Sequence, residues 1–242
     1  MARDGPTAVV TGGGSGIGAA CARRLAEAGH LVVLVGRRPE PLRKAAERIA
    51  AAGGEAHPFP ADVRDWERLG DLNDALAGWS DRVDVVVNAA GGQFAGPADE
   101  LTPDGWRAVV DTNLTGTFFV CRRLFPLMCG HGAAIVNVVA GVWQRPFRGM
   151  AHSGAARAGV VSLTRTLALE WAGHGIRVNA LSPGFTETAA LRDTAGDLSS
   201  LVERVPLGRA ATVDEVADAA MFLLTSTYTT GEVLTVDGGL QL

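Results

Sequence analysis

The chain has 242 residues, a formal net charge of −4 and 47% hydrophobic residues, which suits one folded domain and offers no dense basic surface for nucleic acid. It contains a single Tyr, Tyr228, and a single Lys, Lys44, so an active site that needs these two residue types close together in sequence is excluded. Three cysteines without a CxxC pair fit a reducing compartment, and no apolar run approaches the length of a membrane span. We therefore expect a cytoplasmic protein that acts on a small molecule, without a metal ion and with neither nucleic acid nor a membrane as partner.

Short β-branched segments alternate along the chain with longer segments rich in Ala, Leu and Arg. The predicted strands are residues 7–11, 31–35, 57–61, 83–88, 133–139, 176–181 and 234–236, and the predicted helices are 17–28, 39–52, 65–79, 114–129, 154–172 and 213–224. This alternation, with nearly continuous apolar strands, predicts one α/β domain over residues 1–242 with a seven-stranded parallel sheet and helices on both faces. Residues 185–206 are the least patterned, and we expect a substrate-binding loop or lid there, with an inert surface loop as the alternative.

A glycine-rich turn follows the first predicted strand and precedes a helix: Gly12-Gly13-Gly14-Ser15-Gly16-Ile17-Gly18. Glycines permit positive φ and let the backbone approach a pyrophosphate, which then lies at the amino end of the helix. In a strand–turn–helix unit, this turn predicts a dinucleotide-binding site.

The spacing of Gly12, Gly16 and Gly18 resembles the TGxxxGxG motif of the short-chain dehydrogenase/reductase family. Further matching motifs follow in the family's order: Asp62-Val63, Asn88-Ala89-Ala90-Gly91, Asn113-Leu114-Thr115-Gly116, Pro183-Gly184 with Thr188, and Asp237-Gly238-Gly239. The resemblance implies a doubly wound Rossmann fold and commonly a homotetramer or homodimer. It also implies dinucleotide contacts from Gly12, Ser15, Gly16, Ile17, Gly18, Asp62, Val63, Asn88, Ala90, Pro183, Gly184 and Thr188.

The residues after the second predicted strand indicate which dinucleotide binds. An acidic residue at this position would hydrogen-bond the ribose 2′-hydroxyl of NAD, but here Gly36 is followed by Arg37 and Arg38. Two guanidinium groups suit a 2′-phosphate, so we predict NADP(H) as the cofactor. The alternative, a solvated charge at the start of a helix, is reasonable for Arg38 and less so for Arg37, which lies next to the predicted phosphate.

The catalytic motif of the family is altered in this chain. The usual residues are a Ser after the fifth strand and a Tyr-x-x-x-Lys on the next helix. Alignment of the segment after that Lys places Arg157 at the Lys position, Ser153 at the Tyr position and Ala140 at the Ser position. A Ser hydroxyl is a poor proton donor at neutral pH, and an Arg cannot deprotonate to pass a proton along a relay.

Such a site suits a reaction in which hydride adds to carbon and the electrophile needs only hydrogen-bond donors. Reduction of an activated C=C bond has this character. The segments Gly91-Gly92-Gln93-Phe94 and His152-Ser153-Gly154 resemble those of the short-chain enoyl-CoA and dienoyl-CoA reductases. The resemblance implies an enoyl thioester or enone as substrate.

Within this hypothesis Ser153, with Asn113 or a water that it holds, donates to the substrate carbonyl, and Arg157 holds ribose hydroxyls. His152 either supplies the proton for the α carbon, or it caps the helix or points away from the site. We expect Gln93, Trp143 and Phe185 to line the substrate cleft, although packing in the core or rim is an alternative for each.

Other functions also fit a replaced triad. The chain is alternatively a reductase of imines, iminium ions or ketones in secondary metabolism, a non-redox lyase or cyclase that retains bound cofactor, or an inactive subunit that binds NADPH.

Overall fold

The computed structural model describes residues 5–189, 191 and 199–242, and within them seven parallel strands form one sheet. The strand order is β3-β2-β1-β4-β5-β6-β7. The strands are β1 (Thr7–Thr11), β2 (Leu31–Gly36), β3 (Glu55–Pro60), β4 (Val85–Asn88), β5 (Ala134–Val138), β6 (Arg177–Pro183) and β7 (Val233–Val236). The predicted fold class is confirmed, and each strand end lies within two residues of its predicted position.

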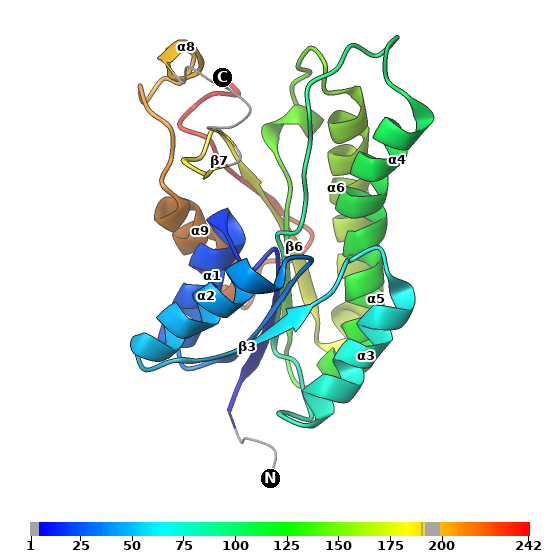
Figure 1. Cartoon of the computed structure of the whole chain (residues 1–242), viewed down its shortest axis with the longest axis vertical. Coiled ribbons are helices and arrows are strands. Elements are labelled where there is room, and N and C mark those ends of the chain that lie inside the picture. The colour runs from blue at the N-terminus through cyan, green and yellow to red at the C-terminus, as the bar shows by residue number, and fades with distance from the viewer. Residues whose placement is uncertain (1–4, 190, 192–198) are drawn as a thin grey trace.

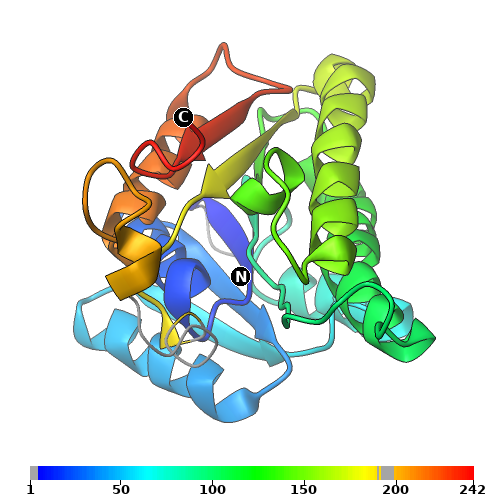
Figure 2. The ribbon, with the colours of Figure 1, turned by 90° about the horizontal axis from the view of Figure 1, so that it is seen from above.

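Helices cover both faces of the sheet (Figures 1 and 2). On one face lie α1 (Gly16–Glu27), α2 (Pro39–Ala51) and α9 (Val213–Thr225), and on the other lie α3 (Trp66–Ala77), α5 (Gly116–Met128) and α6 (Ala151–Trp171). The central strands are buried on both faces, which explains why their sequences are apolar without alternation. Val10 and Leu34 belong to the cluster that contains Leu25 of α1, and Val9 belongs to the cluster that contains Leu124 of α5.

The structure departs from the sequence prediction before α5. An unpredicted helix, α4 (Pro103–Val110), continues through a π-helical turn, η1 (Asp111–Thr115), directly into α5. Its start carries a sequence signal, because Thr102 accepts a hydrogen bond from the amide of Gly105 and Pro103 occupies the first turn. The remaining short helices are η2 (Gly141–Trp143), η3 (Ala172–His174) and α8 (Ser199–Val202).

The expected lid, residues 185–206, follows β6. Residues 190 and 192–198 of this segment lie outside the described residues. The described part is anchored at its beginning, where Thr186 forms an isolated parallel bridge with Ala211, and at its end, where the amide of Leu207 donates to the carbonyl of Gly238 over 3.1 Å. Among the described helices, none is long and apolar enough to cross a membrane.

Candidate cofactor site and active site

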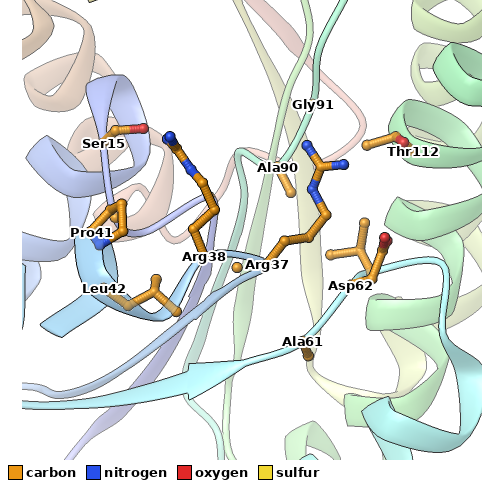
Figure 3. Close-up of a pocket in the computed structure, with 14 residues that line it drawn as sticks. Ser15, Arg37, Arg38, Pro41, Leu42, Ala61, Asp62, Ala90, Gly91 and Thr112 are labelled. Atoms are coloured by element: carbon orange, nitrogen blue, oxygen red, sulfur yellow. The ribbon is translucent and has the colours of Figure 1, made fainter.

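The strand order reverses between β1 and β4, because the chain winds outward from β1 through β2 to β3 and then returns to pair β4 with β1. In parallel α/β sheets, ligands bind outside the carboxyl ends of the strands at this reversal point. A groove lies there, lined by residues that follow β1, β2, β3 and β4 (Figure 3).

The glycine-rich turn after β1 is shaped by close backbone contacts. Gly12 has a φ of +67°, and a Cβ on it would lie 2.7 Å from the carbonyl oxygen of Ala89. A Cβ on Gly18 would collide with the carbonyl oxygen of Gly12, so the first turn of α1 packs directly on the strand end. Ser15 is the amino cap of α1, and its exposed side chain makes no capping hydrogen bond with the helix. Free amides and an uncommitted hydroxyl are the groups that a pyrophosphate needs.

Arg37 and Arg38 line the same groove on the side of β2. Both are exposed, and their guanidinium groups rise from the loop after β2, with Arg38 directed toward Ser15 and Arg37 toward Ala90 (Figure 3). Neither forms an ion pair within the part of the chain that the structure describes. Gly36 has space for a side chain, since a Cβ there would meet Leu42 at an ordinary 3.4 Å. The absence of an acidic residue is therefore not imposed by packing.

Asp62 faces Arg37 from the loop after β3. Its carboxylate accepts hydrogen bonds from the guanidinium of Arg64, the closer at 2.6 Å, and from the backbone amide of Arg64 at 3.0 Å. This pairing, with a smaller contribution from Arg37, lowers the pKa of the Asp62 carboxyl. Because Arg64 already neutralises Asp62, the positive charge of Arg37 remains available to an anionic ligand.

The predicted cofactor residues divide into two groups. Those that line the groove are Gly12, Ser15, Arg37, Arg38, Asp62, Val63 and Ala90. The others lie beside it or beneath it. Gly16 faces Thr188, whose methyl group would be 3.3 Å from an added Cβ, and Ile17 packs against the core. Pro183 ends β6, and Gly184 packs against the backbone of Asp237, where a Cβ would be 2.7 Å from Cα.

Asn88 has a buried structural position. Its side-chain amide donates to Asn137 Oδ1 over 2.9 Å, and Asn137 in turn donates to the hydroxyl of Thr164 over 2.9 Å. The side chain of Asn88 also donates to Cys121 Sγ of α5 over 3.3 Å, so it belongs to a buried polar network and does not line the groove. Any contact of Asn88 with a cofactor would therefore be made by the backbone at the end of β4.

Asn113 links the π-helical turn to the loop after β4. Its Nδ2 donates to the carbonyl of Gly92 over 2.8 Å and to that of Val109 over 2.7 Å, and its Oδ1 accepts from the amide of Gly92 over 3.2 Å. The π turn frees the Val109 carbonyl for this contact. Asn113 is fully buried, and its two hydrogen bonds to Gly92 fix the Gly91–Gly92 backbone from the side of the core.

Arg157 lies on the other side of Gly91. A Cβ on Gly91 would be 2.5 Å from Asn113 Oδ1 and 2.6 Å from Arg157 Nη2, so only glycine fits between them. Nη1 of Arg157 donates to the carbonyl of Val138 over 2.8 Å, whereas its Nε is buried without a partner. Burial lowers the pKa of Arg157 to about 10. No carboxylate among the described residues pairs with this cation, which leaves a positive charge beside the end of the cofactor groove.

Ser153 lies one turn before Arg157 on α6 and is fully buried. Its hydroxyl donates to Oε1 of Gln93 over 2.6 Å. The structure therefore brings Ser153, Arg157, Asn113 and Gln93 together at the carboxyl edge of the sheet. Gln93 itself is exposed.

His152 is fully buried and is not among the residues that line the groove. Its Nδ1 accepts a hydrogen bond from the backbone amide of Ser153 over 2.8 Å, and its ring contacts Phe94 edge to face with centroids 4.5 Å apart. Burial lowers the pKa of His152. This geometry favours the interpretation that His152 contacts the helix end over that of a proton source.

Trp143 and Phe185 were expected to line the substrate cleft. The indole of Trp143 packs against the small cluster of Val139, Val160 and Val161 and donates from Nε1 to the Ser182 hydroxyl over 3.1 Å. It is thus at least partly a packing residue. Phe185 is partly buried at the start of the lid segment, and its carbonyl accepts from the amide of Ala211.

The only Tyr and the only Lys both lie outside this site. Tyr228 is fully exposed in the loop that enters β7, at the amino edge of the parallel sheet, whereas the site lies at the carboxyl edge. Lys44 is on α2 and pairs with Glu40. Neither residue reaches Ser153 or Arg157.

Sequence reasoning missed three groove residues whose signals are weak. Thr112 lines the groove because the π turn brings it there, and Pro41 and Leu42 line it as the first turn of α2. It also missed the ion pair between Arg64 and Asp62, although the two residues are only two positions apart in the sequence.

Comparison with known proteins agrees with this arrangement. Residues 12–241 match the family model described as enoyl-(acyl carrier protein) reductase. Over 96% of its length the chain is 37% identical to a probable 2,4-dienoyl-CoA reductase of Bacillus subtilis, of which 94% is covered. The chain belongs to the short-chain dehydrogenase/reductase family.

Two further relatives of this family carry a different activity in their names. The chain is 34% identical to the 3-oxoacyl-acyl-carrier-protein reductase of Thermotoga maritima, with complete coverage of both proteins. A variant of actinorhodin polyketide ketoreductase with NADPH is 35% identical and superposes with a TM-score of 0.92, covering 100% of this chain and 99% of the other. The short-chain family members similar to this chain thus include both enoyl-type and keto-type reductases.

Proposed function

We propose that this oxidoreductase uses NADP(H) to reduce an activated C=C bond, as in an enoyl thioester or an enone. The observation that carries the proposal is the composition of the site. A buried Ser153 and a partly buried Arg157 occupy α6 where the family's Tyr and Lys are expected, and the only Tyr of the chain is at the opposite edge of the sheet.

The groove residues fit a phosphorylated dinucleotide. Ser15 and the amides at the start of α1 would hold the pyrophosphate, and Arg37 with Arg38 would hold the 2′-phosphate. Val63 and Ala90 would flank the adenosine end, and Thr188 beside Gly16 would meet the nicotinamide side. A reduced nicotinamide supplies a hydride.

The catalytic side chains suit delivery of that hydride to carbon. When the β carbon of an α,β-unsaturated carbonyl compound gains a hydride, the electron pair of the C=C bond moves toward the carbonyl and forms an enolate. The positive charge of Arg157, one helical turn after Ser153, stabilises such an oxyanion without releasing a proton. Water then protonates the α carbon, and the product is the saturated carbonyl compound.

Ketone reduction is the second candidate, because two relatives are named as ketoreductases. It requires a proton on the carbonyl oxygen. The site offers a Ser hydroxyl that already donates to Gln93 and an Arg that cannot relay a proton. For this reason we place reduction of an activated C=C bond before ketone reduction.

A panel assay separates the candidates. The protein is mixed with NADPH and with enoyl thioesters, enones, cyclic imines or ketones, and loss of the reduced-nicotinamide absorbance is followed. We expect oxidation with enoyl thioesters or enones. Binding of NADPH without oxidation across the panel would favour a non-redox enzyme or an inactive subunit instead.

We also propose self-association into a homotetramer or homodimer. Large apolar side chains are exposed on helices outside the site, namely Leu169 on α6 and Phe222 on α9, with exposed fractions of 82% and 57%. Sedimentation equilibrium tests this, and a monomer at micromolar concentration would contradict it.

A further inference from the structure

Ser153 cannot serve the substrate as its sequence position suggests. A hydroxyl has a single hydrogen, and that of Ser153 is directed to Gln93 Oε1 over 2.6 Å. Ser153 is also completely buried. A substrate carbonyl that used the Ser153 hydroxyl would have to break this short hydrogen bond first.

The other end of the Gln93 carboxamide is available. A carboxamide carries one acceptor oxygen and an NH2 group with two donors. The oxygen is engaged by Ser153, and no group among the described residues accepts from the NH2. Gln93 is an exposed residue and is not part of the buried core.

The backbone that carries Gln93 is fixed on both sides. On the preceding side, Asn113 bonds both the amide and the carbonyl of Gly92. On the following side, Phe94 packs edge to face on the buried ring of His152, and the amide of Gly96 donates to the carbonyl of Gly149 over 3.1 Å. The donor is thus held in place before substrate arrives, as oxyanion stabilisation requires.

The position relative to the cofactor groove is also suitable. Gln93 is two residues after Gly91, which lines the groove and contacts Arg157 Nη2 closely enough to exclude any side chain. Ser153, which bonds Gln93, is also one helical turn from Arg157, so the Gln93–Ser153 pair and the Gly91–Arg157 pair are neighbours at this end of the groove.

We propose that the carboxamide NH2 of Gln93 is the catalytic hydrogen-bond donor to the substrate carbonyl oxygen, and that Ser153 is a positioning residue that orients this carboxamide. The inference rests on the proposed reduction of an activated C=C bond. The hydride comes from the reduced nicotinamide and forms a C–H bond at the β carbon, the π electrons move to the carbonyl oxygen, and Gln93 donates to that oxygen without losing a proton. The α carbon takes its proton from water as the enolate collapses.

Two variants distinguish the roles. Gln93→Glu keeps an acceptor for the Ser153 hydroxyl but removes the NH2 donor, whereas Ser153→Ala keeps the NH2 donor but frees the carboxamide to rotate. We expect Gln93→Glu to lower kcat about 100- to 1,000-fold, as loss of one oxyanion donor does elsewhere. Ser153→Ala should lower kcat less than about tenfold, since the donor itself remains. The rate of Gln93→Glu should rise as pH falls toward the ordinary carboxyl pKa of about 4.3, because a protonated carboxyl again donates.

A spectroscopic measurement makes the test independent of turnover. A carbonyl-labelled enoyl thioester is bound with oxidised cofactor, and the C=O stretch is recorded by infrared difference spectroscopy. Wild type and Ser153→Ala should both show a stretch lowered by hydrogen bonding, and Gln93→Glu should not. The opposite order, with the large loss of rate and of infrared shift in Ser153→Ala, would overturn the assignment. If wild type reduces no panel substrate but the infrared order holds, the proposed reaction fails while the donor assignment stands.

Discussion

The cofactor preference depends on Arg37, and replacement by Ala removes its guanidinium without filling the groove. The side chain has no ion-pair partner among the described residues, and the nearby Asp62 is already neutralised by Arg64. The variant is therefore expected to fold normally. Its effect should be confined to the ligand that carries a 2′-phosphate.

The expected magnitude follows from the type of contact. A hydrogen bond to a charged group contributes about 1.5–3 kcal/mol, which corresponds to roughly a 10- to 150-fold change in affinity. Because Arg37 is exposed and screened by solvent, the lower part of this range is expected for Arg37→Ala. Arg37→Asp should lose more, since a carboxylate would repel the phosphate.

Isothermal titration with NADPH and with NADH measures the change directly. NADPH affinity should fall by at least about tenfold, while NADH affinity should change less than about twofold. Arg48→Ala is the matched control, because Arg48 is an exposed Arg on α2 that does not line the groove. An equal loss for both dinucleotides would refute the reasoning, and so would a loss of NADPH affinity in the control.

Three further predictions concern the site and the fold. Gly91→Ala should lower kcat/KM about 10- to 100-fold, because the added methyl group would press on Asn113 and Arg157. The control variant Gly92→Ala, whose Cβ would have nothing within 4 Å, should keep a kcat/KM near that of wild type. Steady-state kinetics that show the same loss for both variants would contradict this prediction. Asn137→Ala should lower the melting temperature by roughly 2–12 °C, because it leaves the buried side chains of Asn88 and Thr164 without a hydrogen-bond partner. A calorimetric melting temperature equal to that of wild type would contradict this prediction. Arg209, together with the amide and hydroxyl of Thr212, lowers the pKa of Glu215 from 4.5 to about 2, so the stabilisation that Glu215 gives α9 is complete above pH 4.5 and is lost as pH falls toward 2. The difference in melting temperature between wild type and Glu215→Gln should accordingly shrink over that interval, and a difference that stays constant would contradict the assignment.

The strands and the cofactor groove were accessible from sequence because their signals are local. β1 and the glycine turn adjoin along the chain, and Gly36 with Arg37 is read directly at the end of β2. The parallel topology then brings the loops after these strands to one edge. The prediction of the strands and of the groove therefore required no knowledge of contacts between residues far apart in the sequence.

The interior of the site depends on long-range contacts that no local pattern contains. Gln93 and Ser153 are 60 residues apart, and their hydrogen bond forms only because the fold brings α6 beside the loop after β4. The side chain of Asn88 turned out to bond Asn137 on the neighbouring strand, because a parallel register places the two side by side. The π turn at Asn113 was likewise missed, because the one residue that a π turn adds to a helix leaves no clear mark in the hydrophobic pattern of the sequence.

The central claim is hydride delivery to the β carbon of an activated C=C bond at a site without Tyr or Lys. Its most direct test is incubation with a 2-enoyl thioester and NADPH deuterated at the transferred position, followed by mass and NMR analysis of the product. The account predicts a saturated thioester with one deuterium on the β carbon. It is contradicted by deuterium on the carbonyl carbon of a reduced ketone, or by NADPH that binds and is oxidised by no enoyl thioester or enone.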